Sequence, residues 1–331
     1  MKILFTTAKK EAVSTILNLE KLKLLQEIEG VDFRAFGDDF ENYDIILVMG
    51  YEAEVEKIKD KAPKSLVGVI DPRPGLKKQP EKADFILTNG IEMKDYYSYC
   101  TQNFFDYYIY PQVSGGPKKH KNQDKVVIGY HGNKIHLEEI FPRISQALES
   151  LGKLFKVELK AIYNWEKLGK VSWKPKSFSL TYVQWNSKVY EEHLSQVDIG
   201  IIPDLIPIQK EDRIKKKAST LRKKYNEHQA DYLLRFKPTS NPGRIFPFMQ
   251  YGIPVVCDMF PSGLQLIDDG QDSFIAYSSS AWFSKLKSLA EDSELRQEMG
   301  DNFRAKFQSG YSPEILNQNL IKFFYSLLNK K

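Results

Sequence analysis

Short apolar runs alternate with longer amphipathic stretches through the first third of the chain. The runs predict strands at residues 2–6, 32–36, 44–49, 65–70, 84–88 and 105–110. Helical patterns at 11–29 and 51–61 separate several of these strands. Strands that alternate with helices indicate a parallel sheet. Residues 1–112 are therefore expected to form one doubly wound α/β domain.

The apolar periodicity stops between residues 113 and 125, where Gly, Pro, Ser and Lys predominate, and this segment is predicted to be a linker. The α/β pattern then resumes over 126–310. Strands are expected at 126–130, 155–162, 178–183, 198–202, 255–258 and 273–277. Helices are expected at 137–151, 189–195, 279–291 and 293–309. Two such domains are expected to face each other across a ligand-binding cleft.

Several polar residues directly follow predicted strands, and ligands of open parallel sheets bind beyond the carboxyl ends of the strands. Asp71 ends one strand, and it is either a catalytic base or a turn residue that pairs with Arg73. His131, Gly132 and Asn133 follow another strand. Gly132 would let the backbone approach a ligand closely, and His131 is either structural or active in acid–base chemistry.

A basic, hydroxyl-rich loop in the second half precedes an apolar segment that ends in Gly252-Ile253-Pro254. The loop is Lys237-Pro238-Thr239-Ser240-Asn241-Pro242-Gly243-Arg244. The start of a helix presents unpaired N–H groups and partial positive charge, to which Lys237 and Arg244 add two full charges. This combination suits a diphosphate. The alternative is an ordinary helix-capping loop with a solvated Lys and Arg.

The net charge of +5 is concentrated in one segment. Residues 209–228 hold eight Lys or Arg and three acidic residues, and the rest of the chain is balanced. The segment 210–224 is either a solvated helix or lid, or a contact for an anionic acceptor, a lipid-linked substrate or a membrane surface. No nucleic-acid-binding signature accompanies it, so no nucleic-acid partner is expected.

Other features narrow the class of protein. Cys100 and Cys257 form neither a disulfide framework nor a metal pattern, and no secretory signal or membrane span is visible. A cytoplasmic protein is expected, with membrane contact limited to the inner surface. Dinucleotide-binding, Walker A and nucleophile-elbow motifs are absent from the sequence.

The second half resembles the donor domain of GT-B glycosyltransferases, in a divergent branch close to family 4 and the family 1-like group. The resembling segments are the loop from Lys237 to Arg244, Phe248-Met249-Gln250-Tyr251-Gly252-Ile253-Pro254-Val255-Val256, Asp269-Gly270-Gln271-Asp272-Ser273, Ile128-Gly129-Tyr130-His131-Gly132-Asn133 and Asp198-Ile199-Gly200-Ile201-Ile202-Pro203. The resemblance covers about 126–310, whereas 1–112 agrees in pattern only. It implies two Rossmann-like domains and a final helix within 311–331 that crosses back to the N-terminal domain.

The resemblance also implies a function. Such enzymes transfer a sugar from a nucleotide-diphosphate donor, often UDP-linked, to an acceptor in glycan biosynthesis, generally without a metal or another cofactor. The implied donor-binding residues are Gly132, Asn133, Lys237, Thr239, Ser240, Asn241 and Arg244. Tyr163 and Trp185 are candidates for stacking on the nucleotide base, and Asp71 and His131 are the candidate catalytic residues.

One departure from family 4 keeps other functions open. Two positions that usually hold Glu in that family are Thr239 and Pro247 here, and Pro247 should delay or kink the helix. The alternatives are a non-catalytic nucleotide-sugar or polyanion-binding protein on the same scaffold, or a sugar-nucleotide epimerase.

Overall fold

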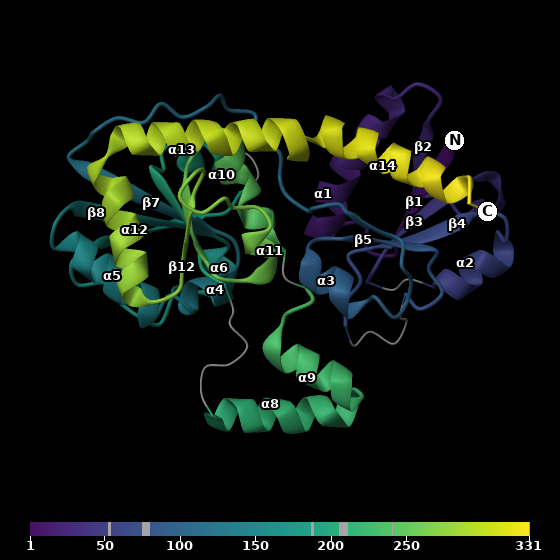
Figure 1. Ribbon diagram of the computed structural model, residues 1–331, viewed down its shortest axis with the longest axis horizontal. Helices are drawn as coiled ribbons and strands as arrows, with labels where there is room; N and C mark the ends of the chain where they lie inside the picture. Colours follow the sequence, from purple (N-terminus) through teal and green to yellow (C-terminus); the bar gives the residue numbers. More distant parts are fainter. Residues whose placement is uncertain (52–53, 75–79, 187–188, 205–210, 240, 331) are drawn as a thin grey trace. The chain divides into compact units, whose positions relative to one another are not determined.

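Two compact units make up the chain, each built around a six-stranded parallel sheet (Figure 1). The computed structural model describes residues 1–51, 54–74, 80–186, 189–204, 211–239 and 241–330, with 211–217 described by their helical backbone. Unit 1 comprises Met1–Tyr110, Ile206–Pro242 and Gly310–Lys331, and unit 2 comprises Pro111–Leu205 and Gly243–Ser309. The α/β fold with two doubly wound sheets that the apolar pattern predicted is confirmed.

The sheet of unit 1 has the strand order β2-β1-β3-β4-β5-β6. Its strands are β1 (Lys2–Thr6), β2 (Asp32–Ala35), β3 (Ile45–Met49), β4 (Leu66–Ile70), β5 (Phe85–Thr88) and β6 (Phe104–Asp106). Every residue of β3, β4 and β5 is buried, as expected for central strands that helices cover on both faces. The strand expected at 105–110 ends at Asp106, and the Tyr-rich segment after it is not a strand.

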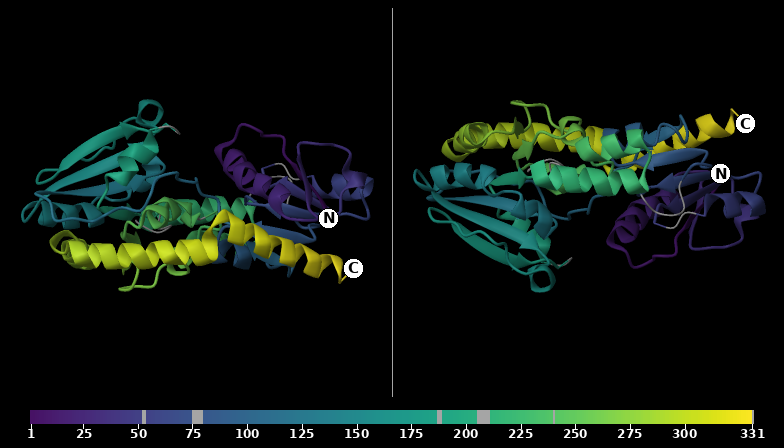
Figure 2. Two further views of the ribbon diagram at one scale, coloured as in Figure 1. Left: turned by 90° about the horizontal axis from the view of Figure 1, so that it is seen from above. Right: turned by 90° about the horizontal axis from the view of Figure 1, so that it is seen from below.

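Four helical segments of unit 1 are α1 (Val13–Leu22), α2 (Val55–Lys61), α3 (Ile91–Tyr96) and α14 (Pro313–Leu328). The short 3-10 turns η1 (Lys23–Glu27) and η2 (Phe40–Asn42) complete its first half. Helix α14 runs beside the sheet of unit 1 (Figure 2). It packs on this sheet through Phe323 and Phe324, whose rings lie 5.8 and 5.4 Å from that of Phe85. The last helix is thus part of the core of unit 1.

Two helices of unit 1, α8 (Glu211–Lys224) and α9 (Glu227–Arg235), come from a segment that is inserted in sequence between strands of unit 2 (Figure 1). Helix α9 begins at Asn226, whose side chain caps the amide of Gln229. Tyr232 fastens α9 to α3: its hydroxyl donates to the Glu92 carbonyl at 3.0 Å, and its ring lies 5.4 Å from that of Tyr96. Helix α8 packs along α9.

The sheet of unit 2 has the strand order β12-β11-β10-β7-β8-β9. Its strands are β7 (Lys125–His131), β8 (Lys156–Tyr163), β9 (Ser179–Gln184), β10 (Ile199–Ile202), β11 (Val255–Asp258) and β12 (Phe274–Ala276). Because β11, β10 and β7 are neighbours and parallel, the residues that follow them meet at one edge of the sheet.

The helices of unit 2 cover both faces of its sheet. They are α4 (Lys134–Glu138), α5 (Arg143–Gly152), α6 (Trp165–Leu168), α7 (Tyr190–Ser195), α10 (Phe246–Tyr251), α11 (Pro261–Leu264), α12 (Ser279–Glu291) and α13 (Ser293–Lys306). The 3-10 turn η3 (Pro242–Arg244) precedes α10, and the π turn η4 (Phe307–Tyr311) follows α13. The single helix expected at 137–151 is wrong: α4 and α5 are separate, because Pro142 lacks the N–H that a continuous helix needs.

Within the part of the chain that the structure describes, no helix combines the length and apolar character needed to cross a membrane.

Candidate functional site

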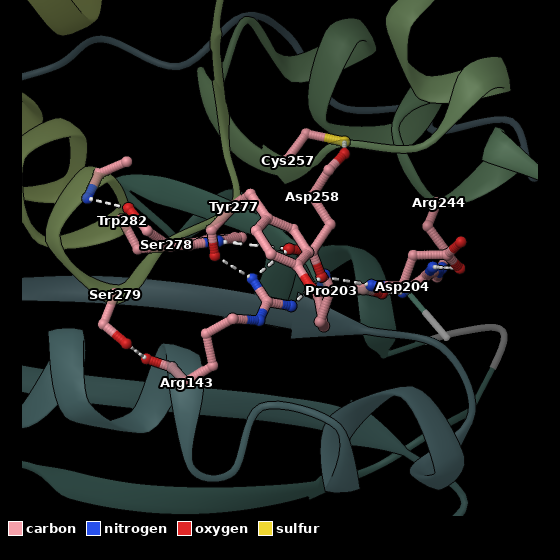
Figure 3. A network of polar contacts seen from close by, with 11 residues as sticks. Arg143, Pro203, Asp204, Arg244, Cys257, Asp258, Tyr277, Ser278, Ser279 and Trp282 are labelled. Atoms are coloured by element: carbon pink, nitrogen blue, oxygen red, sulfur yellow. Dashed lines mark hydrogen bonds and ion pairs between the residues drawn. The ribbon is translucent and has the colours of Figure 1, made fainter. Parts of the chain in front are cut away.

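The carboxyl edge of the unit 2 sheet gathers the polar residues that follow its central strands. His131 ends β7, Asp204 comes two residues after β10, and Asp258 ends β11. Each of the three side chains is at least nine-tenths buried. Arg244, at the end of η3, joins this group, and Figure 3 shows it beside Asp204.

The guanidinium of Arg244 lies over the end of β10. Its Nη1 donates to the Pro203 carbonyl at 2.8 Å, and its Nη2 lies 3.6 Å from Asp204 Oδ1. His136 of α4 completes the cluster, with Nδ1 3.4 Å from Arg244 Nη2 and 3.5 Å from Asp204 Oδ1. The Arg244 side chain keeps 13% of its surface exposed. A planar cation with remaining donors at a strand end has the chemistry of a phosphate ligand.

His131 holds the backbone of Arg244 in place. Its Nε2–H donates to the Arg244 carbonyl at 2.8 Å, and its ring lies 5.2 Å from that of Phe248 in α10. Burial lowers the pKa of His131 to about 4, so the imidazole is neutral at neutral pH. The bond to a carbonyl fixes the proton on Nε2, and the geometry therefore gives His131 a positioning role at this edge.

Gly132 makes room for the aliphatic part of the Arg244 side chain. Its φ is +140°, and a Cβ at this position would lie 2.7 Å from Arg244 Cδ. Asn133 caps α4, because its side-chain oxygen accepts from the Ile135 amide at 3.1 Å. The turn 131–133 thus contributes backbone shape and a helix cap next to Arg244.

A second arginine holds the same edge of the sheet (Figure 3). Arg143, the first residue of α5, makes two bonds to the Asp258 carboxylate, at 2.6 and 2.9 Å. Asp258 Oδ2 also accepts from the Asp204 amide at 2.8 Å, and its Oδ1 accepts from Trp282 Nε1 at 3.3 Å. Asp258 therefore ties the ends of β10 and β11 to the starts of α5 and α12.

Sequence reasoning missed His136, Asp204, Arg143 and Asp258 as members of this site. Asp204 and Asp258 could have been found by the rule that named Asp71, because both follow buried strands. Arg143 and His136 carry no such signal, since their roles depend on which strand ends lie beside them.

The predicted phosphate loop 237–244 is divided between the units: Lys237, Thr239 and Asn241 belong to unit 1, and Arg244 to unit 2. The Asn241 side-chain amide donates to the Ile109 carbonyl at 3.2 Å, and Lys237 and Thr239 are partly buried. Ser240 lies outside the described residues. A joint role of these residues in donor binding stays a prediction.

Asp71 occupies the carboxyl edge of the unit 1 sheet. It has a φ of +51° and a side chain that is 3% exposed. Its carboxylate accepts from Arg73 Nη2 at 2.5 Å and from the Asn89 amide at 2.8 Å. Burial raises the pKa of Asp71 even though Arg73 and Asn89 favour the ionised form. A carboxyl held in this way exchanges its proton closer to neutral pH than an ordinary Asp does.

The two candidate stacking residues differ in exposure. Tyr163 is completely buried, and its hydroxyl donates to the Gly169 carbonyl at 2.8 Å, so its ring belongs to the core. Trp185, after β9, is 41% exposed. Of the two, Trp185 is the aromatic residue that a ligand in solution could reach.

The basic segment forms α8 and the turn after it. Arg222, Lys223 and Lys224 are exposed at the end of α8, and Lys210 lies outside the described residues. No group of three or more His, Cys, Asp or Glu side chains within the described ranges could hold a metal ion.

Comparisons with known proteins bear on the fold. The sequence matches no protein-family model and no curated protein sequence. Sucrose-phosphate synthase from Thermosynechococcus elongatus is similar in structure, with a TM-score of 0.60 and 10% identity over 100% of this chain and 99% of that one. Phage T4 BGT in complex with its UDP-glucose substrate has a TM-score of 0.58 and 16% identity over 98% of this chain and 99% of that one.

A third similar structure is a mutant of S. aureus TarM in complex with fondaparinux, α-GlcNAc-glycerol and UDP. Its TM-score is 0.53 and its identity 9%, over 85% of this chain and 55% of TarM, so the chain spans about half the length of TarM. At these identities the likeness concerns the fold, and the protein has the GT-B fold that its sequence predicted.

Proposed function

We propose that the protein is a glycosyltransferase that moves a sugar from a nucleotide-diphosphate donor to an acceptor. The observation that carries this proposal is the guanidinium of Arg244, which is positioned by His131 and Gly132 at the carboxyl edge of the second sheet of a GT-B fold. The structures of phage T4 BGT with UDP-glucose and of TarM with UDP support a uridine donor.

In the proposed reaction, the bond between the sugar carbon and the diphosphate oxygen breaks, and its electron pair stays on the diphosphate. The acceptor hydroxyl forms the new bond to that carbon and gives up its proton. Arg244 stabilises the additional negative charge that develops on the diphosphate as the bond breaks, because a preorganised cation interacts more strongly with the transition state than with the ground state. Lys237 would add a second cation. Asp204 Oδ1 lies 3.6 Å from Arg244, and the phosphate oxygens would replace it as the partner of the guanidinium.

The proton requires an acceptor, and two residues were predicted for this step. Burial raises the pKa of Asp71, which makes this carboxylate a stronger base than an ordinary Asp. His131 already donates to the Arg244 carbonyl, and its pKa is lowered to about 4. We therefore propose Asp71 as the base and His131 as the residue that positions Arg244.

Donor binding tests the proposal directly. Calorimetry against UDP-, GDP- and ADP-sugars should find one donor that binds, and Arg244→Ala should weaken that binding about 10- to 100-fold, as expected for a lost charge-assisted bond. Arg244→Lys should recover part of the loss, because one point charge replaces a bidentate fork. Arg235→Ala, which removes an exposed arginine of α9, serves as the control. The absence of any donor binding by the folded protein would exclude the proposed function.

We further propose that transfer needs no divalent metal, because Arg244 and Lys237 supply the charge that a metal would bring to the diphosphate. Phage T4 BGT also has a structure with UDP and Mn2+, so the question is experimental. Transfer rates should be the same with EDTA and with added Mn2+ or Mg2+. A large decrease of the transfer rate in EDTA would show that Arg244 and Lys237 cannot replace a metal ion at the diphosphate.

A non-catalytic role on the same scaffold is the second candidate, and the sequence of α10 favours it. Pro247 stands in the first turn of α10, at a position where family 4 enzymes usually carry Glu. A protein that binds a nucleotide sugar without transfer, hydrolysis or conversion would fit this role. Conversion of a UDP-sugar in the absence of an acceptor would instead indicate an epimerase.

The basic helix α8 suggests where the acceptor is found. We propose that Arg222, Lys223 and Lys224 bring the protein to the anionic cytoplasmic membrane surface, where a lipid-linked or otherwise anionic acceptor would lie. Vesicles with about a third anionic lipid should bind the protein, and neutral vesicles should not. Charge reversal of the three residues should abolish binding, whereas Lys119→Glu should not. Equal binding to both kinds of vesicle would contradict the proposal.

A further inference from the structure

A cavity lies on unit 2, apart from the Arg244 cluster. Its volume is about 600 Å³, and its walls come from α5, α12 and the segment before β9. This volume falls within the range of about 300–1,000 Å³ that is usual for small-molecule sites. Arg244, Asp204 and Asp258 are not among its lining residues.

The charge of this cavity is unbalanced. Lys153, Lys174 and Lys176 line it and are exposed, and their side chains form no ion pair within the part of the chain that the structure describes. Glu149 is the acidic residue in the lining, and its two oxygens accept from the amides of Lys176 and Ser177, each at 2.7 Å. The Glu149 carboxylate is therefore held by backbone amides, and the three lysines outweigh its single negative charge in the lining.

Aromatic side chains form the apolar part of the lining. Phe141, between α4 and α5, is 59% exposed, and Phe283 of α12 is partly buried. Trp173 is 7% exposed, and its Nε1 donates to the Leu137 carbonyl at 3.3 Å, which fixes the ring. Gln146 and Ser150 add an amide and a hydroxyl. The cavity thus offers apolar walls, hydrogen-bonding groups and unpaired cations together.

We propose that this cavity binds an anionic saccharide, a sugar unit that carries a phosphate or a carboxylate. The C–H faces of a sugar ring pack on aromatic side chains, its hydroxyls match amide and hydroxyl groups, and its anionic group matches the three lysines. The site is separate from the proposed nucleotide-sugar site and does not depend on it. It would hold part of a charged glycan while leaving the Arg244 edge free.

Ligand-observed NMR with four probes tests the saccharide and its charge. The probes are glucose 6-phosphate, a glucuronate oligosaccharide, neutral glucose and uridine monophosphate. At least one of the anionic sugars should bind at least about tenfold more tightly than glucose, and its binding should weaken with salt, as expected for charge pairing near the surface. The phosphate and carboxylate probes separate the two sources of charge. Failure of both anionic sugars to bind at about 10 mM, or binding of the nucleotide alone, would overturn the proposal.

Variants locate the binding. Lys174→Glu with Lys176→Glu should weaken binding of the anionic sugar about tenfold or more, and Phe141→Ser should weaken it severalfold. These side chains are exposed, so folding should be retained, which circular dichroism would verify. The matched control is Lys119→Glu with Lys121→Glu, also exposed on unit 2. Arg244→Ala should leave the anionic sugar bound, and an equal loss in the control or in Arg244→Ala would overturn the assignment to this cavity.

Discussion

The carboxyl edges of the two sheets both bury a carboxylate beside an arginine, but the origin of the arginine differs. In unit 1, Asp71 pairs with Arg73, its neighbour in the same turn, at 2.5 Å. In unit 2, Asp258 pairs with Arg143, which is 115 residues distant in the sequence. Asp71 also accepts from Asn89 and so links the ends of β4 and β5, whereas the Asp258 network ties the ends of two strands to the starts of two helices.

The difference assigns different chemistry to the two edges. The Asp71 carboxyl has a raised pKa because burial outweighs one partly exposed arginine and one amide. The Asp258 carboxylate instead organises its neighbours, because it accepts from Arg143, Trp282 and the Asp204 backbone. Under the proposed function, the unit 1 edge would accept the proton, and the unit 2 edge would hold Arg244 in a fixed position for the diphosphate.

The largest expected effect comes from removing one charge at each edge. Asp258→Asn should lower the free energy of unfolding by about 3–5 kcal/mol, since it leaves the mostly buried Arg143 without its partner. Asp71→Asn should change it by less than about 1 kcal/mol, because Asn retains the oxygen that Asn89 contacts and tolerates a positive φ. Urea unfolding of the two variants at pH 7 measures the contrast.

The matched control for this pair is Glu291→Gln, which removes an exposed partner of Lys287 and should cost less than about 0.5 kcal/mol. If Asp71→Asn destabilised the protein as much as Asp258→Asn, the distinction between a local pair and an organising network would be wrong.

The strands could be predicted from the sequence, but the hydrogen-bond network around Asp258 could not. A strand was predicted at the position of each described strand, because even β2, β6 and β9, which are only partly buried, contain short apolar runs. Residues next to a strand, such as Asp71, His131 and Gly132, could be named from position alone. Arg143 could not be named in this way, because its contact with Asp258 depends on the order of the strands in the sheet. The break before α5 could not be predicted from apolar spacing, because the helical spacing of apolar residues continues through Pro142.

The burial of His131 predicts a pH dependence at the unit 2 edge. Burial lowers its pKa to about 4 from an ordinary 6.5, so the unfolded chain takes up a proton first as the pH falls. Stability should therefore fall between pH 6.5 and pH 4, by up to about 3 kcal/mol from this residue. In His131→Gln this part of the decrease should vanish, as measured by urea unfolding at several pH values. The exposed His228→Gln should keep the decrease, and an unchanged profile in His131→Gln would show that His131 is solvated.

Unit 1 also buries a lysine without a carboxylate partner, whereas Arg143 and Arg244 of unit 2 each face a carboxylate. Lys21 of α1 is 1% exposed, donates to the Tyr108 carbonyl, and lies 4.3 and 4.4 Å from the ring centres of Tyr107 and Tyr110. Burial lowers its pKa to about 7, so the unfolded chain holds the proton to higher pH. Stability should rise by about 2 kcal/mol between pH 7 and pH 9, and Lys21→Met should remove the rise. A rise that persists in Lys21→Met would assign it to other groups.

The smallest expected effect comes from adding a Cβ at Gly132, and a control glycine separates backbone strain from the displacement of Arg244. Gly132→Ala puts a Cβ 2.7 Å from Arg244 Cδ, so the guanidinium should shift and donor affinity should fall about tenfold, or about 1.4 kcal/mol. Gly270→Ala is the matched control, because Gly270 also has a positive φ, +83°, but no atom within 4 Å of an added Cβ. Both variants should lose about 1 kcal/mol of stability or more through strain, and only Gly132→Ala should lose donor affinity in calorimetry. Equal donor affinity in the two variants would mean that the exact position of Arg244 does not matter for binding, and the fixed arginine of the unit 2 edge would lose its functional meaning.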